Sequence, residues 1–196
     1  MTRIGVLVSG RGSNLGAIIA ACQAGAIEGE VTMVASNREC PALQVARDAG
    51  VAEVRAFPLR DYVDPPARDG AMAAALRAAG VELVVCAGYN RVLDDGLVRA
   101  FEGRILNVHP SLLPAFGGTM EAIRRAHEAG VSETGVTIHL IEPGTIDAGT
   151  ILAQERVPIE PGDALEALEE RVHATEHRLL PATIQAVIEG RLVTQA

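Results

Sequence analysis

Seven short aliphatic runs separated by helical patterns restrict the fold of this chain more than any other feature of its sequence. Several runs are continuous, as at residues 6–8 and 83–86, whereas a strand with one face in water alternates apolar and polar residues. Continuous runs are typical of strands that helices cover on both faces. The sequence therefore predicts an α/β fold with a doubly wound, mostly parallel seven-stranded sheet. The expected strands cover residues 4–8, 31–35, 51–57, 83–87, 105–108, 136–141 and 151–159.

The length and composition of the chain suit one domain, which we expect to span residues 1–196. The sequence contains two Tyr, three Phe and no Trp, so aliphatic side chains must fill the core. Residues 61–68, which include Pro65 and Pro66, are expected to form a loop. No repeat or low-complexity segment divides the sequence.

The formal net charge of −8 opposes the nonspecific attraction to phosphate backbones that basic proteins show, so a nucleic-acid partner is not expected. A small anion can still bind at a helix N-terminus or beside an arginine. Cys22, Cys40 and Cys86 are odd in number and lack Cys-x-x-Cys spacing, which predicts free thiols and no metal site. No apolar stretch approaches the roughly 20 residues that span a membrane, and we expect a cytoplasmic protein.

An amide and an imidazole stand two residues apart at the end of one apolar run. Side chains at positions i and i+2 of a strand point to the same face, so Asn107 and His109 can converge on one bound atom before the chain turns at Pro110. This arrangement suits stabilising an oxyanion while a proton moves. A structural Asn and His packed beside a turn is the alternative interpretation.

A glycine-containing turn follows the first expected strand. Gly10 and Gly12 allow the backbone to approach a ligand, and the helix that starts near Ser13 and Asn14 offers free N–H groups to an anion. Leu15 stands where a dinucleotide-binding fingerprint needs a small residue, and no Lys-Ser/Thr pair follows, so the pattern favours a monophosphate. A tight turn in which Ser13 only caps the helix is the alternative.

The loop after His139 contains carboxylates that are candidates for an ion pair with His109. The polar loop that follows this strand contains Glu142 and Asp147. An aspartate next to His109 would stabilise the charged imidazole and make it a proton donor near neutral pH. Asp147 could instead serve only as a turn residue.

A long final helix is expected to begin at residues 161–163, where Asp163 can cap it and Glu166 can complete a capping box. Helical periodicity directs Glu176 along the apolar, inward-facing row, and a buried carboxylate needs a partner. Pro181 is expected to kink or restart the helix, and Gly190 to end it.

Several motifs occur in an order that resembles one family over nearly the whole chain. The string Asn-x-His-Pro-Ser-Leu-Leu-Pro at residues 107–114, with Asp-x-Gly at 147–149, is similar to that of folate-dependent formyltransferases. The Gly-Ser-Asn turn and the compact length resemble the phosphoribosylglycinamide formyltransferases within that superfamily. The other matching motifs lie at residues 86–93, 134–139 and 175–177.

This resemblance implies a Rossmann-like formyltransferase fold and a transferase of purine (IMP) biosynthesis. The reaction would move a formyl group from the co-substrate 10-formyltetrahydrofolate to the amine of 5′-phosphoribosylglycinamide, without a metal. The partners would be these small molecules rather than nucleic acid or a membrane. The sequence leaves the oligomeric state open, and a homodimer is one possibility.

The resemblance also implies roles for individual residues. Asn107 would polarise the formyl oxygen, His109 would stabilise the tetrahedral intermediate and donate a proton, and Asp147 would keep His109 charged. The remaining assignments concern binding: Gly12, Ser13 and Asn14 for the phosphate, Glu176 for the substrate amine, and Asn90, Arg91, Val92, Leu93 and Asn107 for the folate.

Two loops depart from the family pattern. The spacing from His139 to Asp147 is one residue longer than usual, and Thr150 replaces a frequent proline, so the loop at 142–150 is altered. Residues 116–123 lack the usual sequence of a second loop. The basic residue usual near Pro65-Pro66 has no clear counterpart either, and Arg60 or Arg68 would have to replace it.

Rival functions use the same features differently. A 10-formyltetrahydrofolate hydrolase would use the same Asn, His and Asp with water as the acceptor. A methionyl-tRNA formyltransferase would deliver the group to charged tRNA, which the acidic net charge disfavours. A non-catalytic phosphate-binding module would explain the glycine-containing turn but leaves Asn107, His109 and Asp147 without a task.

Overall fold

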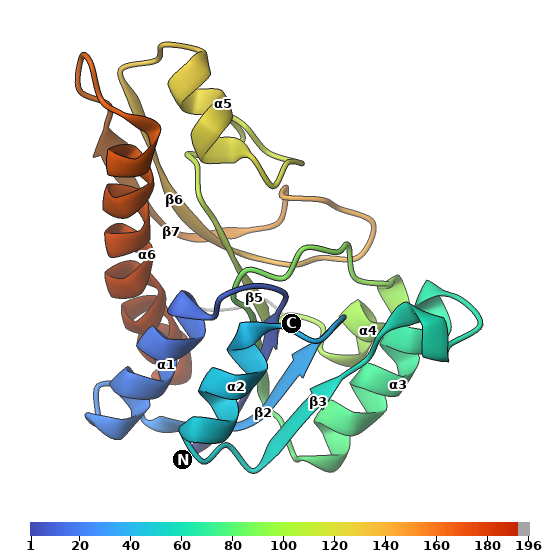
Figure 1. Ribbon diagram of the computed structural model, residues 1–196. Helices are drawn as coiled ribbons and strands as arrows, with labels where there is room; N and C mark the ends of the chain where they lie inside the picture. The colour runs from blue at the N-terminus through green and yellow to red at the C-terminus, as the bar shows by residue number, and fades with distance from the viewer. Residues whose placement is uncertain (192–196) are drawn as a thin grey trace.

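The computed structural model describes residues 1–191 and contains the expected seven-stranded sheet, in the order β3-β2-β1-β4-β5-β6-β7 (Figure 1). Strands β1 to β5 are parallel, while β6 pairs antiparallel with β5 and β7 pairs antiparallel with β6. The prediction of a mostly parallel sheet is confirmed. The strands are β1 (Thr2–Val8), β2 (Gly29–Ser36), β3 (Glu53–Ala56), β4 (Leu83–Cys86), β5 (Ile105–His109), β6 (Glu133–Leu140) and β7 (Ile151–Pro158).

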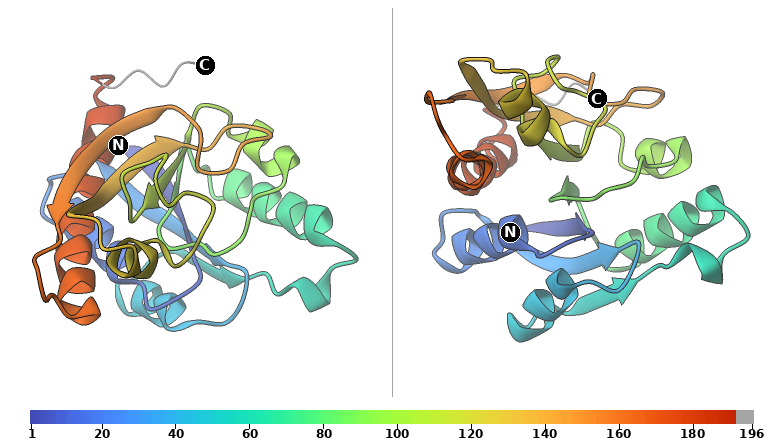
Figure 2. Two further views of the ribbon diagram at one scale, coloured as in Figure 1. Left: turned by 90° about the horizontal axis from the view of Figure 1, so that it is seen from above. Right: turned by 45° about the horizontal axis from the view of Figure 1, so that its top comes forward.

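Helices cover both faces of this sheet, as the continuous apolar strands require. One buried cluster joins the sheet to α1, α2 and α6, and a second joins its other face to α3 and α4. Figures 1 and 2 show α6 running beside α1 at one side of the molecule, with α3 and α4 at the other. The helices are α1 (Ser13–Gln23), α2 (Pro41–Asp48), α3 (Pro65–Ala78), α4 (Asp95–Ala100), α5 (Ala122–Glu128) and α6 (Leu165–Ile188), with a 3₁₀ turn at Leu59–Asp61.

Strand β1 illustrates why the apolar runs are continuous. Ile4 and Val6 pack into the cluster of α1, α2 and α6, whereas Leu7 packs into the cluster of α3 and α4, and all three are fully buried. Successive side chains of a strand point to opposite faces, so both faces must be apolar. Burial of each such side chain contributes about 1.5 to 3 kcal/mol.

The expectation of a loop over residues 61–68 is wrong in its second half, because α3 begins at Pro65. Asp64 is its N-cap, and the Asp64 side chain accepts a hydrogen bond from the Ala67 backbone N–H at 2.8 Å. Proline suits the first helical position, where no intrahelical partner exists for the N–H that it lacks. The two prolines therefore start a helix instead of preventing one.

The capping box expected at the start of α6 is also wrong. The N-cap is Ala164, with no side-chain cap. The Asp163 carboxylate instead accepts from the Glu160 backbone N–H at 2.7 Å and pairs with Arg171. The helix does not restart at Pro181, which lies inside the continuous α6, and Gly190 follows its end with a φ of 68° as expected of a C-terminal glycine.

Candidate active site

A cavity of about 970 Å³ opens where the parallel strands end, next to β1, β4 and β5. This volume is typical of small-molecule sites, and the position between β1 and β4 is the point where the strand order reverses. All of the site residues expected from the sequence line it. They are Gly12, Ser13, Asn14, Asn90, Arg91, Val92, Leu93, Asn107, His109, Asp147 and Glu176.

His109 is held between two acceptors. Its Nε2 lies 3.0 Å from the carbonyl oxygen of Phe116, and its Nδ1 lies 3.4 Å from Oδ2 of Asp147. A carbonyl oxygen only accepts hydrogen bonds, so Nε2 carries a hydrogen. The Asp147 carboxylate faces Nδ1 and can accept a hydrogen from it.

Asp147 lies in the β6–β7 loop with a φ of 48°, in the left-handed region that few non-glycine residues adopt. Its Oδ2 accepts a hydrogen bond from the Gly118 backbone N–H at 2.8 Å. Contact with His139 lowers the pKa of this carboxyl, and the Gly118 bond and the charge of His109 add to that effect, against the opposing effect of burial. Asp147 therefore stays negative beside His109.

His139 completes the group, although no role for it was expected from the sequence. The antiparallel pairing of β5 with β6 places His139 directly opposite Asn107. Its Nε2 lies 3.1 Å from Nδ2 of Asn107 and 3.6 Å from Oδ1 of Asp147. The same Oδ1 lies 3.4 Å from Nδ2 of Asn107. One carboxylate is thus shared by two imidazoles. Only the strand register reveals this contact, and a single sequence does not show that register.

The turn between β1 and α1 exposes the N-terminus of α1 to the cavity. Gly12 has a φ of 87° and is the N-cap, which rules out Ser13 as the cap. A Cβ on Gly12 would lie 2.8 Å from Cβ of Ala42, so packing also requires a glycine there. A Cβ added to Gly10 would meet nothing within 4 Å, which leaves open space on the cavity side. The first-turn N–H groups of α1 suit an anion such as phosphate.

Glu176 projects from α6 toward this turn and is only 4% exposed, as the helical periodicity predicts. Its Oε2 accepts hydrogen bonds from Asn14 Nδ2 and from His173 Nδ1, both at 3.0 Å. The hydrogen bond to Glu176 raises the pKa of His173, against the effect of burial. His173 also lines the cavity but was missed from the sequence, although its position one helical turn before Glu176 is a usable signal.

The segment at residues 90–93 forms a wall of the same cavity after β4. The Asn90 backbone N–H donates to Ser9 Oγ at 3.0 Å, and Asn90 Oδ1 accepts from Asn37 Nδ2 at 3.2 Å. Leu93 is buried, whereas Val92 is 64% exposed at the rim. This wall is anchored by polar contacts at one end and offers apolar surface at the other.

The altered loop at 142–150 has its own anchor. The Glu142 carboxylate accepts hydrogen bonds from the Thr150 backbone N–H at 2.9 Å and from Thr150 Oγ1 at 2.8 Å. These bonds lower the pKa of Glu142. The Gly144 N–H donates to Asp95 Oδ1 at 3.0 Å, which ties the loop to α4. Thr150 therefore fixes the base of the loop that carries Asp147. It does so through a backbone N–H and a side-chain hydroxyl, both of which a proline would lack.

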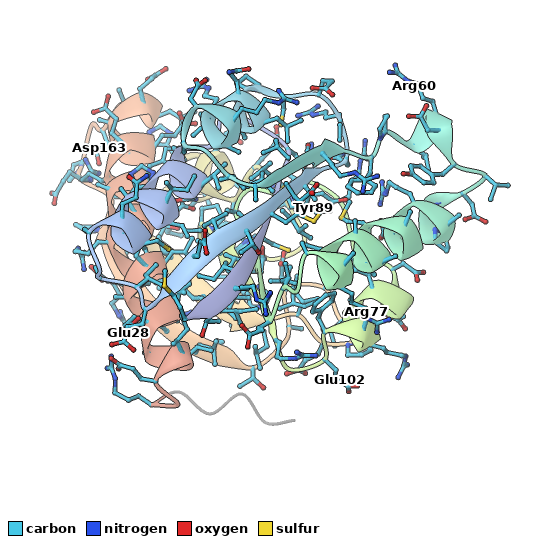
Figure 3. All side chains as sticks on the ribbon, turned by 90° about the horizontal axis from the view of Figure 1, so that it is seen from below. Glu28, Arg60, Arg77, Tyr89, Glu102 and Asp163 are labelled. Atoms are coloured by element: carbon cyan, nitrogen blue, oxygen red, sulfur yellow. The ribbon has the colours of Figure 1, made fainter. Side chains whose placement is uncertain are left out.

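Neither Arg60 nor Arg68 takes the place of the basic residue expected near Pro65-Pro66, because neither lines the cavity. The Arg60 side chain is 83% exposed and points away from the centre of the molecule, far from Tyr89 (Figure 3). Arg68 is buried and forms an ion pair with Asp69 at 2.7 Å. Arg91 is the arginine of the segment 90–93 that borders the cavity.

Comparison with known proteins matches residues 2–184 to the formyl transferase family. The chain belongs to the formyl transferase family. It is 43% identical over 185 residues to the phosphoribosylglycinamide formyltransferase of Mycobacterium tuberculosis, covering 94% of this chain and 84% of that protein. It is also similar to the structure of glycinamide ribonucleotide transformylase 1 from Symbiobacterium toebii, with a TM-score of 0.94, 46% identity, and coverage of 100% and 92% of the two chains.

Some of the relatives are much longer than this chain. The trifunctional purine biosynthetic protein adenosine-3 of Gallus gallus is 40% identical over 189 residues, which cover 96% of this chain but only 18% of that protein. Within residues 1–191 of this chain, no helix is long and apolar enough to cross a membrane. In the same part of the chain, no group of three or more His, Cys, Asp or Glu side chains is arranged to hold a metal ion.

Proposed function

We propose that this protein transfers the formyl group of 10-formyltetrahydrofolate to the amine of 5′-phosphoribosylglycinamide, a step of purine (IMP) biosynthesis. The observation that carries the proposal is the meeting of Asn107, His109 and Asp147 in one cavity that also contains the N-terminus of α1. Family relatives with this activity in their names support the same reaction. Both the formyl donor and the acceptor are substrates.

The reaction requires an oxyanion to be stabilised and one proton to move. The acceptor amine attacks the formyl carbon, and the carbonyl electron pair moves to the formyl oxygen. Asn107 and the charged His109 would stabilise that oxygen. The bond from the formyl carbon to the folate nitrogen then breaks, and that nitrogen takes a proton from His109. His109 recovers a proton from the attacking amine, so the cycle closes without a net change in the enzyme.

The two ends of the cavity suit the two ends of the acceptor. The phosphate would bind the N–H groups at Gly12, Ser13 and Asn14, while Glu176 would contact the amine. Both protein hydrogen bonds found for Glu176 among residues 1–191 reach Oε2, so Oε1 is available for a substrate. Residues 90–93 and Asn107 would contact the folate.

We also infer that residues 1–196 constitute one formyltransferase domain that acts on small molecules in the cytoplasm. The continuous sheet and the two buried clusters on its faces support the single domain over the described residues. Sedimentation of the purified chain decides between a monomer and a homodimer.

The test mixes purified protein with 10-formyltetrahydrofolate, with and without phosphoribosylglycinamide, and follows loss of the formyl group from the folate. We expect turnover that depends on the acceptor, with a formylated product in equal amount. Turnover without the acceptor would identify a hydrolase. Absence of turnover under both conditions, with binding of the phosphorylated acceptor retained, would leave only a phosphate-binding module.

A further inference from the structure

The side-chain amide of Asn107 is turned the wrong way for the role expected of it. Its Nδ2 lies 3.1 Å from His139 Nε2 and 3.4 Å from Asp147 Oδ1, so both amide hydrogens have partners inside the protein. The free end is then the carbonyl oxygen Oδ1, which has no hydrogen to donate. An oxyanion needs a donor at that position. Rotation of the amide by about 180° would exchange the two ends.

The hydrogens on His139 decide between these two orientations. His139 Nδ1 lies 2.9 Å from the carbonyl oxygen of Leu140, which only accepts, so Nδ1 carries a hydrogen. In the neutral ring Nε2 is then bare and accepts from the Asn107 NH₂, which is the observed orientation. In the charged ring Nε2 also carries a hydrogen, and of the two ends of the Asn107 amide only Oδ1 can accept it. The NH₂ then faces the opposite direction.

Two carboxylates and one imidazole lie around His139 in this site. Asp147 Oδ1 lies 3.6 Å from Nε2, so a hydrogen on Nε2 faces this carboxylate as well as the Asn107 amide. Glu142 of the same loop is a second negative charge that interacts with His139, while the His109 ring of β5 faces the other oxygen of Asp147. From β7, the residue paired with His139 is the uncharged Ile151.

The turned amide has one unfavourable contact. Its Oδ1 would take the place of Nδ2 beside Asp147 Oδ1, so two oxygens would face each other at about the distance now seen between nitrogen and oxygen. A hydrogen on His139 Nε2, directed at both oxygens, offsets this repulsion, and a neutral ring does not. The orientation of Asn107 is therefore tied to the charge of His139.

We propose that His139 is a positioning residue that, in its charged form, turns the Asn107 amide so that its NH₂ faces the formyl oxygen. The inference rests on the proposed function, because it assigns a task to Asn107 in formyl transfer. His139 itself need not touch either substrate. Loss of its charge would leave the site assembled but aim an acceptor oxygen at the developing oxyanion.

Two substitutions separate this role from a purely structural one. His139→Leu keeps the bulk but cannot orient the amide, and we expect kcat to fall about 10- to 100-fold with smaller changes in KM. Asn107→Ala should lower kcat about 100-fold or more. In the double variant, kcat should be less than about twofold lower than in Asn107→Ala alone, because His139 acts through Asn107. Additive losses would overturn the proposal.

A third variant guards against a folding defect. The glutamine amide introduced by His139→Gln can donate to Asn107 Oδ1 at any pH, so this variant should retain more activity than His139→Leu and lose one ionisation from the pH profile of kcat. His127→Leu is the matched control, since His127 bonds the Asp163 carbonyl away from the cavity, and it should leave kcat unchanged. Equal losses in His139→Gln and His139→Leu would contradict an orienting role.

The charge of His139 can be measured directly, without an activity assay. Nitrogen NMR of the histidine rings in the full chain, assigned with His139→Gln, should show hydrogens on both nitrogens of His139 at the pH of maximal turnover. A neutral ring at that pH would refute the inference even where formyl transfer is observed. If the wild-type protein transfers no formyl group, the proposed function fails separately, and the ring-nitrogen result still reports the state of His139.

Discussion

Asp147 binds two histidines with two different oxygens, and this sharing sets the electrostatics of the site. Oδ2 faces His109 and accepts from Gly118, while Oδ1 faces His139 and Asn107. A carboxylate with these neighbours is stabilised in its charged form, and its pKa is lowered accordingly, with the contact to His139 as the largest cause. The negative charge is therefore present throughout the pH range in which a histidine can gain or lose its proton.

Replacement of Asp147 by asparagine removes this charge while keeping the size of the side chain. We expect kcat/KM at neutral pH to fall about 100-fold and the pH optimum to move to lower pH, because no carboxylate then stabilises a charged imidazole. The measurement is the pH profile of kcat/KM for both proteins. An unchanged profile would contradict the pairing of His109 with Asp147.

A second residue-scale prediction concerns His173 and Glu176. Because Glu176 raises the pKa of His173, the folded state holds this proton more tightly than the unfolded state. The resulting stability is fully present below the unfolded pKa of about 6.5 and is lost as the pH rises through the folded value. Glu176→Gln should therefore destabilise the protein more at about pH 5 than at about pH 9.

The expected difference is under about 1 kcal/mol, since the His173 side chain is 49% exposed and solvent screens the pair. Urea unfolding at both pH values measures it. Glu169→Gln is the matched control on the same helix, because Glu169 influences His173 only through its charge, and it should show a smaller pH dependence. The same dependence in both variants would argue against a specific Glu176 contact.

At this scale the sequence predicts best where residues are close in the chain. Asn107 and His109 at i and i+2 of a strand, and the inward position of Glu176 on a helix, follow from local periodicity and are seen in the structure. His139 and the Phe116 carbonyl depend on strand register and loop conformation, which nothing in a single sequence specifies. The part of the site that was missed is the part made by tertiary contacts.

At the scale of elements, the β1–α1 turn links packing to ligand binding. Gly12→Ala places a Cβ 2.8 Å from Ala42 Cβ and 2.9 Å from Ala42 Cα at a φ of 87°. Both the backbone conformation and the overlap oppose it, so we expect a loss of about 1 to 3 kcal/mol of stability and weaker binding of the phosphorylated acceptor.

Gly10→Ala is the matched control in the same turn. Its Cβ meets nothing within 4 Å, and Gly10 has no positive φ, so the free energy of unfolding should change by less than about 0.5 kcal/mol. Urea unfolding of the two variants compares them directly. Equal destabilisation would contradict a specific cost of the overlap with Ala42 and of the positive φ at Gly12.

Element types were predictable, and element ends were less so. Seven strands and the long last helix follow from apolar periodicity, which reports burial on both faces of the sheet. The start of α3 at Pro65 and the absent capping box at Asp163 depend on competing local partners: Asp64 caps one helix, and Arg171 binds the residue expected to cap the other. Caps are decided by such contacts, which composition does not reveal.

At the scale of the whole molecule, the cavity draws on the parallel and the antiparallel parts of the sheet together. β1, β4 and β5 supply the turn, the segment 90–93 and the Asn107–His109 edge, whereas the β6–β7 loop supplies Asp147 and α6 supplies Glu176. A ligand that contacts these elements is bound by the native state and not by the unfolded chain. Binding must therefore raise the stability of the entire fold.

This linkage gives the last prediction. Phosphoribosylglycinamide at about 100 times its Kd should stabilise the protein by about 2.7 kcal/mol, which corresponds to a rise in Tm of about 5 to 10 °C for a chain of this size. The same compound without its phosphate should give a much smaller shift at equal concentration, because the N–H groups of α1 then have no anion to bind. Because the net charge of −8 opposes nonspecific binding of an anion, a shift that depends on the phosphate reports a specific site. Equal shifts for the two compounds, measured by thermal unfolding, would show that the β1–α1 turn does not bind the phosphate.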